Sequence, residues 1–183
     1  MKKSHLIFVV ILLGILVVVA TVVFFVREQA TQEALDEAGR TLFGNDETPA
    51  YVDMLGSPIS LETYRGSIII VNAWASWSPY AVTELPVLDR LAGEFTDKNV
   101  VLIAVNRKES QVQAERFLAT LPVLPHTKLI IDTNDYFYGV IGGYAMPETV
   151  VYDQAGTIVL RTRGTLQLEE LRAVLNNLTQ QAP

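Results

Sequence analysis

The feature that most constrains the fold of this chain is an apolar run at residues 67–74, made largely of β-branched side chains. A strand that is apolar on both faces is typical of a sheet with helices on its two sides. A second such run lies at 100–105. Between them, Leu85, Leu88 and Leu91 follow the spacing of a helix with one apolar face. The pattern predicts an α/β domain over residues 49–183.

The rest of this region continues the alternation of strands and helices. Further strands are predicted at 51–53, 58–61, 128–132, 148–153 and 157–163, and helices at 80–95, 110–121, 134–140 and 167–178. Strand–helix–strand units that precede a hairpin and a last helix imply a mixed central sheet flanked by helices.

Before this domain, residues 6–26 are almost unbroken apolar sequence. As a helix this run would measure about 31 Å, enough to cross a bilayer. Lys2 and Lys3 precede it, so the positive-inside tendency keeps residues 1–5 in the cytoplasm. We therefore expect a single-pass anchor in the cell membrane, a stalk at 27–48 and an extracytoplasmic domain. A signal peptide cleaved near Ala20 is the alternative.

Charge and cysteine content narrow the possible functions. Two of the 14 basic residues precede the apolar run and all 20 acidic residues follow it, which leaves a net charge of −8 beyond it. Such a chain is a poor nucleic-acid binder, and its expected partners are an extracytoplasmic protein or peptide and, through the helix, the membrane. The chain has no cysteine, so it can form no disulfide.

Four segments carry a resemblance to a known family. They read V-N-A-W-A-S-W-S-P-Y-A-V-T-E-L-P at 71–86, Y-G-V-I-G-G-Y-A-M-P-E-T at 138–149, L-E-T-Y-R-G at 61–66 and D-Q-A-G-T-I at 153–158. Taken in their order along the chain, they resemble the thioredoxin-like TlpA/ResA/CcmG (DsbE) group of redoxins. The resemblance implies a thioredoxin fold, with Pro147 after a cis peptide bond. It places Ser78 and Ala81 at the positions of the family's two active-site cysteines.

Thiol–disulfide exchange begins with a thiolate, which an alcohol cannot replace. Ser78 is therefore expected to cap the helix that follows. The other possibility, a serine nucleophile, would need a base, and the only histidines are His5 and His126. By resemblance, Glu84 matches an acid that tunes the family's thiols. Without thiols, its expected role is that of a first-turn acid favoured by the helix dipole.

Binding of a peptide or partner protein does not require the two cysteines. Trp77 and Tyr80, which flank Pro79, are the aromatic candidates for a binding surface, whereas Trp74 closes an apolar strand and is expected in the core. Met146 and Pro147 match the loop that, in the family, pairs with the backbone of a substrate. No Cys/His cluster or phosphate-binding loop is present in the sequence, so we expect neither a metal nor a cofactor.

Three functional hypotheses remain. The first is a non-redox module that binds a peptide or partner. The second is a thiol–disulfide oxidoreductase, for disulfide reduction or cytochrome c maturation, whose cysteines were replaced naturally or by engineering. The third is a structural subunit of a membrane redox complex. Whether the chain is an enzyme stays open, because fold resemblance does not establish activity.

Overall fold

The structure is a computed structural model that describes residues 14, 18–25 and 51–181. Residues 18–25 form a helix of exposed, largely apolar side chains. Within the described ranges, no helix combines the length and hydrophobicity needed to cross a membrane. The predicted segments 1–5 and 27–48 and most of 6–26 lie outside these ranges, so the anchor and stalk stay predictions.

Residues 51–181 form a seven-stranded sheet in the order β2-β1-β5-β4-β3-β6-β7. β3 pairs in parallel with β4 and antiparallel with β6, so the sheet is mixed, as predicted. The strands are β1 (Tyr51–Asp53), β2 (Pro58–Ile59), β3 (Ile68–Trp74), β4 (Val100–Arg107), β5 (Thr127–Asp132), β6 (Glu148–Tyr152) and β7 (Ile158–Arg163).

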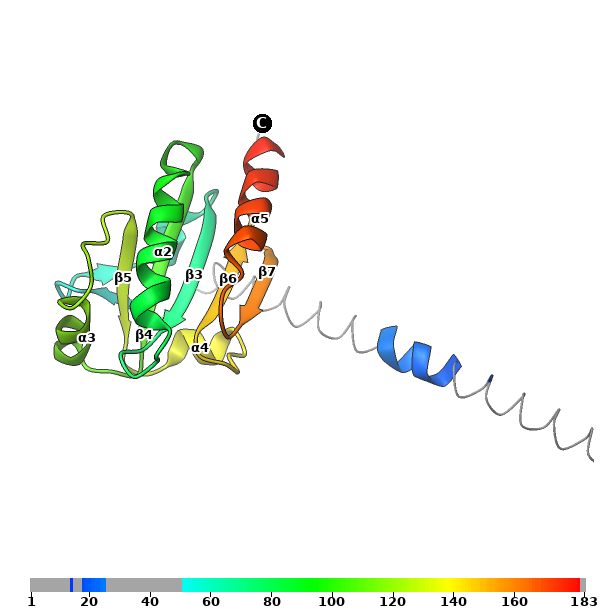
Figure 1. The fold of residues 1–183 in the computed structure, drawn as a ribbon, viewed down its shortest axis with the longest axis horizontal. Helices are drawn as coiled ribbons and strands as arrows, with labels where there is room; N and C mark the ends of the chain where they lie inside the picture. Colours follow the sequence, from blue (N-terminus) through cyan, green and yellow to red (C-terminus); the bar gives the residue numbers. More distant parts are fainter. Residues whose placement is uncertain (1–13, 15–17, 26–50, 182–183) are drawn as a thin grey trace, which may run out of the picture. The chain divides into compact units, whose positions relative to one another are not determined.

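The helices follow the predicted order (Figure 1). They are α2 (Ala81–Gly93), α3 (Gln111–Leu118), α4 (Tyr136–Val140) and α5 (Leu168–Gln181), with 3-10 turns η1 (Leu61–Tyr64) and η2 (Thr96–Lys98). Ser110 precedes α3 and its side chain accepts a hydrogen bond from the amide of Gln113 at 3.3 Å, which is an N-cap contact. The predicted strand at 58–61 is shorter, because Leu61 starts a 3-10 turn.

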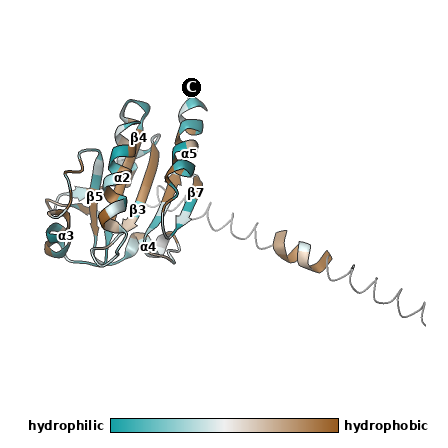
Figure 2. Ribbon diagram, viewed as in Figure 1, coloured by the Kyte–Doolittle hydropathy of each residue, from teal (hydrophilic) through white to brown (hydrophobic). Residues whose placement is uncertain are grey.

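The core lies between the sheet and its helices. Strand β3 is buried along its whole length, as its composition requires. On one face, Ile68 and Ile70 pack with residues of both α2 and α5, including Leu88 and Leu171. Figure 2 shows the corresponding pattern, with a hydrophobic β3 and mixed helices. A second cluster, with Trp74, Ala81 and Leu85, holds the start of α2 against the end of β3, where the candidate site lies.

Candidate functional site

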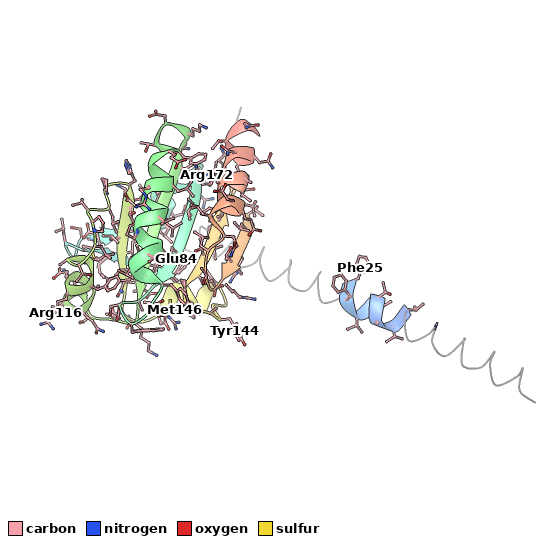
Figure 3. The ribbon with its side chains drawn as sticks, viewed as in Figure 1. Phe25, Glu84, Arg116, Tyr144, Met146 and Arg172 are labelled. Atoms are coloured by element: carbon pink, nitrogen blue, oxygen red, sulfur yellow. The ribbon has the colours of Figure 1, made fainter. Side chains whose placement is uncertain are left out.

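Two loops meet at one end of the sheet. β3 ends at Trp74 and β6 begins at Glu148, and the two strands pair antiparallel with Ala73 opposite Glu148. The loop at 75–80 and the loop at 141–147 therefore leave the sheet side by side. The peptide bond between Met146 and Pro147 is cis, which confirms the prediction. Figure 3 shows Met146 and Tyr144 at this end of the domain, beside α4.

Ser78 does not cap α2, contrary to the sequence-based expectation. The helix begins at Ala81, and the N-cap position belongs to Tyr80, whose side chain makes no capping bond. The hydroxyl of Ser78 is buried and has no hydrogen-bond partner. The reason is a tight turn: the Ser78 amide donates to the carbonyl of Ala75 at 3.0 Å, and the Ser78 carbonyl, not its hydroxyl, accepts from Ala81 at 3.2 Å.

Ala81 lies inside an apolar cluster with Trp74, Leu85, Ala104 and Ala114. Its side chain is 1% exposed. The position that resembles the family's second cysteine is thus filled by a methyl group in the core. Neither position holds a thiol, and disulfide exchange by this chain is chemically impossible.

As predicted, Trp74 is a core residue, whereas Trp77 and Tyr80 lie at the surface. Trp74 is fully buried and packs against Phe117 with ring centroids 5.4 Å apart. Trp77 is 62% exposed and Tyr80 is 44% exposed, so both present ring surface to solvent. Pro79 between them is also exposed. The 75–80 loop therefore carries a small apolar surface.

Glu109, which sequence reasoning missed, holds this loop in place. Its buried carboxylate accepts hydrogen bonds from the Ser76 amide at 2.8 Å, the Ser76 hydroxyl at 2.5 Å, the Asn106 amide group at 2.7 Å and Gln113 at 2.8 Å. A polar Asn106 at the end of an apolar strand, with an acid three residues later, was the available signal. Four donors satisfy the carboxylate without a cation.

Glu84 is more buried than a first-turn acid needs to be. It is 7% exposed, and one carboxylate oxygen accepts a hydrogen bond from the Leu166 amide at 2.8 Å while the other has no partner. Burial raises the pKa of Glu84, and the Leu166 amide and the Asn72 side chain partly offset that rise. The Asn72 amide nitrogen donates to the Thr149 hydroxyl at 3.0 Å, and its oxygen has no donor. Burial therefore makes ionisation of Glu84 less favourable than in solvent.

Around the cis peptide bond, the main-chain groups of the residues next to Met146 are engaged. Glu148 accepts from the amides of Tyr144 at 2.9 Å and Ala145 at 3.3 Å. The Tyr138 hydroxyl donates to the Ala145 carbonyl at 2.6 Å, and the Gly164 amide donates to the Pro147 carbonyl at 2.9 Å.

Met146 differs from these two neighbours. No hydrogen bond joins its amide or its carbonyl to another residue of the described part of the chain. Its neighbour Pro147 is buried, so the loop is anchored to the domain at that residue. The fold thus offers one main-chain donor and one acceptor at Met146, between two residues whose main-chain groups are engaged.

Two ionic clusters brace this loop, and sequence reasoning assigned a role to neither. Glu148 is fully buried and pairs with Arg161 at 2.5 Å and, more loosely, with Arg163 at 3.6 Å. Arg107 pairs with Asp135 at 2.5 Å and stacks 3.4 Å above the ring of Tyr138. The sequence shows that arginines and acids lie near the ends of strands. Which arginine pairs with which acid is decided by the tertiary structure.

A serine nucleophile at Ser78 is excluded for the histidine that the structure describes. His126 lies against Gly93, near the end of α2, whereas Ser78 precedes the start of the same helix. A 13-residue helix spans about 20 Å, far beyond hydrogen-bonding reach. Residues 14, 18–25 and 51–181 contain no group of three acidic or histidine side chains able to hold a metal ion.

Comparison with known proteins then assigns the family. Residues 45–161 match the model of the AhpC/TSA family, more than half of the chain. The chain belongs to the AhpC/TSA family. It is similar to the thiol-disulfide oxidoreductase ResA of Bacillus thuringiensis subsp. konkukian, with 26% identity over 98% of this chain and 99% of the relative. The ResA of Geobacillus thermodenitrificans is 27% identical over 69% of this chain and 71% of the relative.

Solved structures support the thioredoxin-like fold of this AhpC/TSA member. A putative thiol:disulfide interchange protein DsbE from Chlorobium tepidum superposes with a TM-score of 0.66 at 22% identity, over 71% of this chain and 92% of that chain. A putative thioredoxin from Neisseria meningitidis gives 0.64 at 20% identity, over 73% and 90%. The predicted kinship with ResA- and DsbE-like proteins is confirmed, and the cysteine-free chain is consistent with replaced cysteines.

Proposed function

We propose that this protein is a non-redox module that binds an extended peptide or a partner protein outside the cytoplasm. The observation that carries the proposal is the unpaired main chain of Met146 beside the cis bond, between Ala145 and Pro147, whose main-chain groups are engaged. An extended peptide can complete such a donor–acceptor pair as a strand does at a sheet edge. The exposed rings of Trp77 and Tyr80 offer apolar surface for its side chains.

Attachment to the cell membrane belongs to the same proposal. The apolar run at 6–26 and the lysines before it support a single-pass anchor with the folded domain on the far side. Protease protection in intact cells tests this orientation. Digestion of residues 51–181 by an external protease is the expected result, and protection of the domain would oppose it.

Peptide binding is tested with fluorescently labelled extended peptides and the full-length protein in detergent micelles. Affinity should fall by about tenfold when the peptide amide that pairs with Met146 is N-methylated, since a desolvated donor is lost. N-methylation one residue along is the matched control, because alternate amides of a strand point away. Equal affinities for both methylated peptides would refute pairing with Met146.

A second candidate function is an oxidoreductase whose cysteines were replaced. The buried, unpartnered hydroxyl of Ser78 favours it, because that side chain fits no local polar role. The test is insulin reduction by Ser78→Cys/Ala81→Cys beside the unchanged protein. Reduction by the double variant alone would mean that the scaffold is still tuned for thiol chemistry. A folded, inactive double variant would favour the binding module.

A further inference from the structure

A positive charge that is only partly compensated lies next to the Met146 loop. Arg163 ends strand β7, and its side chain is 49% exposed. Its nearest carboxylate is that of Glu148, at 3.6 Å. Its guanidinium also lies 5.8 Å from the ring centroid of Tyr144, which is itself 85% exposed. A cation and an aromatic ring therefore face solvent together at this end of the domain.

Glu148 compensates the charge of Arg163 only in part, because the same carboxylate pairs more closely with Arg161. It is fully buried and holds Arg161 at 2.5 Å, together with the amides of Tyr144 and Ala145. One carboxylate thus faces two guanidinium groups. The side chain of Arg161 is 8% exposed, so the excess positive charge is presented to solvent by Arg163.

The position of Arg163 suits recognition of a bound peptide. In the register of the hairpin, Arg163 lies opposite Glu148, and the next amide, that of Gly164, bonds to the carbonyl of Pro147 at 2.9 Å. Neighbouring strands lie about 4.8 Å apart. A peptide paired with Met146 would place an adjacent side chain within reach of the guanidinium, which binds carboxylates through a planar fork of donors.

The acidic groups nearby do not cancel this charge. Glu84 is buried, and its carboxylate accepts a hydrogen bond from the Leu166 amide. Asp135 is paired with Arg107. Glu169 and Glu170 are exposed in the first turn of α5, and Glu169 acts on Arg172, one turn further along that helix. None of the four is bonded to Arg163.

We propose, on the basis of the peptide-binding function above, that the site selects an extended peptide with an acidic side chain next to the residue paired with Met146. Arg163 is the specificity residue and the ring of Tyr144 is its support. This preference runs against the net charge of the chain, which is −6 and would by itself attract basic peptides. The charge of Arg163 therefore predicts a preference for acidic peptides, whereas the net charge of the chain predicts a preference for basic ones.

The test compares three peptides of roughly ten residues, alternating Thr and Val, that carry one Asp, Asn or Lys next to the pairing position. Anisotropy titrations use the full-length protein in micelles. The Asp peptide should bind about three- to fivefold more tightly than the Asn peptide, the range of a partly exposed ion pair. This advantage should shrink between about 50 mM and about 500 mM salt.

Variants assign the effect to one residue. Arg163→Gln should remove the advantage of the Asp peptide and leave the Asn peptide unchanged. Arg116→Gln makes the same charge change on α3, away from Tyr144 in Figure 3, and should preserve the advantage. Thermal melts verify that both variants fold.

The possible failures are distinguishable. If the Asn peptide binds and N-methylation weakens it, but Asp gives no advantage or Lys binds best, the acidic preference is overturned while the binding function stands. If none of the three peptides binds, both proposals fail. An Asp advantage that survives Arg163→Gln would overturn the assignment to Arg163.

Discussion

The carboxylate of Glu109 clamps Ser76 by both its main-chain amide and its hydroxyl, at 2.8 and 2.5 Å. Ser76 lies directly before Trp77, whose ring is largely exposed. A buried acid from the β4–α3 connection thus sets the conformation of a loop 33 residues earlier in the chain. The exposed aromatic surface is held by polar contacts beneath it.

Glu109→Gln should loosen this loop and destabilise the domain. The amide places a donor group where the carboxylate accepts four hydrogen bonds, so we expect a loss of about 1–3 kcal/mol in the free energy of unfolding. Urea titration measures that loss, and acrylamide quenching should report a more mobile Trp77, because Trp74 is buried. Glu115→Gln, on the exposed side of α3, is the control and should leave both values unchanged.

Ser78→Ala should stabilise the protein by about 1 kcal/mol. The buried hydroxyl of Ser78 has no partner, so its removal relieves a desolvation cost. Ser110→Ala, by contrast, removes a real N-cap and should cost about 1 kcal/mol. Opposite signs in paired thermal melts would confirm the assignment, whereas a destabilising Ser78→Ala would restore a polar role for Ser78.

Glu84→Gln should change how stability depends on pH. Burial raises the folded-state pKa of Glu84 above the usual range of a glutamate. Its contribution is therefore fully present below the unfolded pKa and is lost as pH rises through the folded pKa. Gln mimics the neutral acid, so the free energy of unfolding of the variant should rise relative to that of the unchanged protein as pH increases from the unfolded-state pKa of Glu84 through its raised folded-state pKa. A pH-independent difference in urea titrations would contradict the raised pKa.

Trp77→Ala should weaken peptide binding without reducing stability, because most of the ring is in solvent. Trp74→Ala should instead cost about 3–5 kcal/mol, since it empties a buried site packed against Phe117. Peptide anisotropy and urea titration separate the two effects. Equal stability losses for both variants would mean that Trp77 also serves the core.

Much of this fold was predictable because its signals are local. The β-branched run before Trp74, the Ser110 cap and the apolar faces of the helices each depend on residues close in sequence. The family motif, by resemblance, also predicted the cis bond before Pro147. Element ends shifted where a turn competed, as at Leu61, because terminal residues lack the contacts that favour one state.

The sequence alone determined the α/β order, the loss of thiol chemistry and the exposure of Trp77. Only the tertiary structure decided that Ser78 is a buried hydroxyl rather than a cap, and that Met146 keeps a free main-chain pair. It also joined Glu109 to Ser76 and left Arg163 without a dedicated acid. These contacts link residues that are far apart in the chain. The spacing of apolar and polar residues in the sequence does not indicate which buried acid accepts a hydrogen bond from which donor.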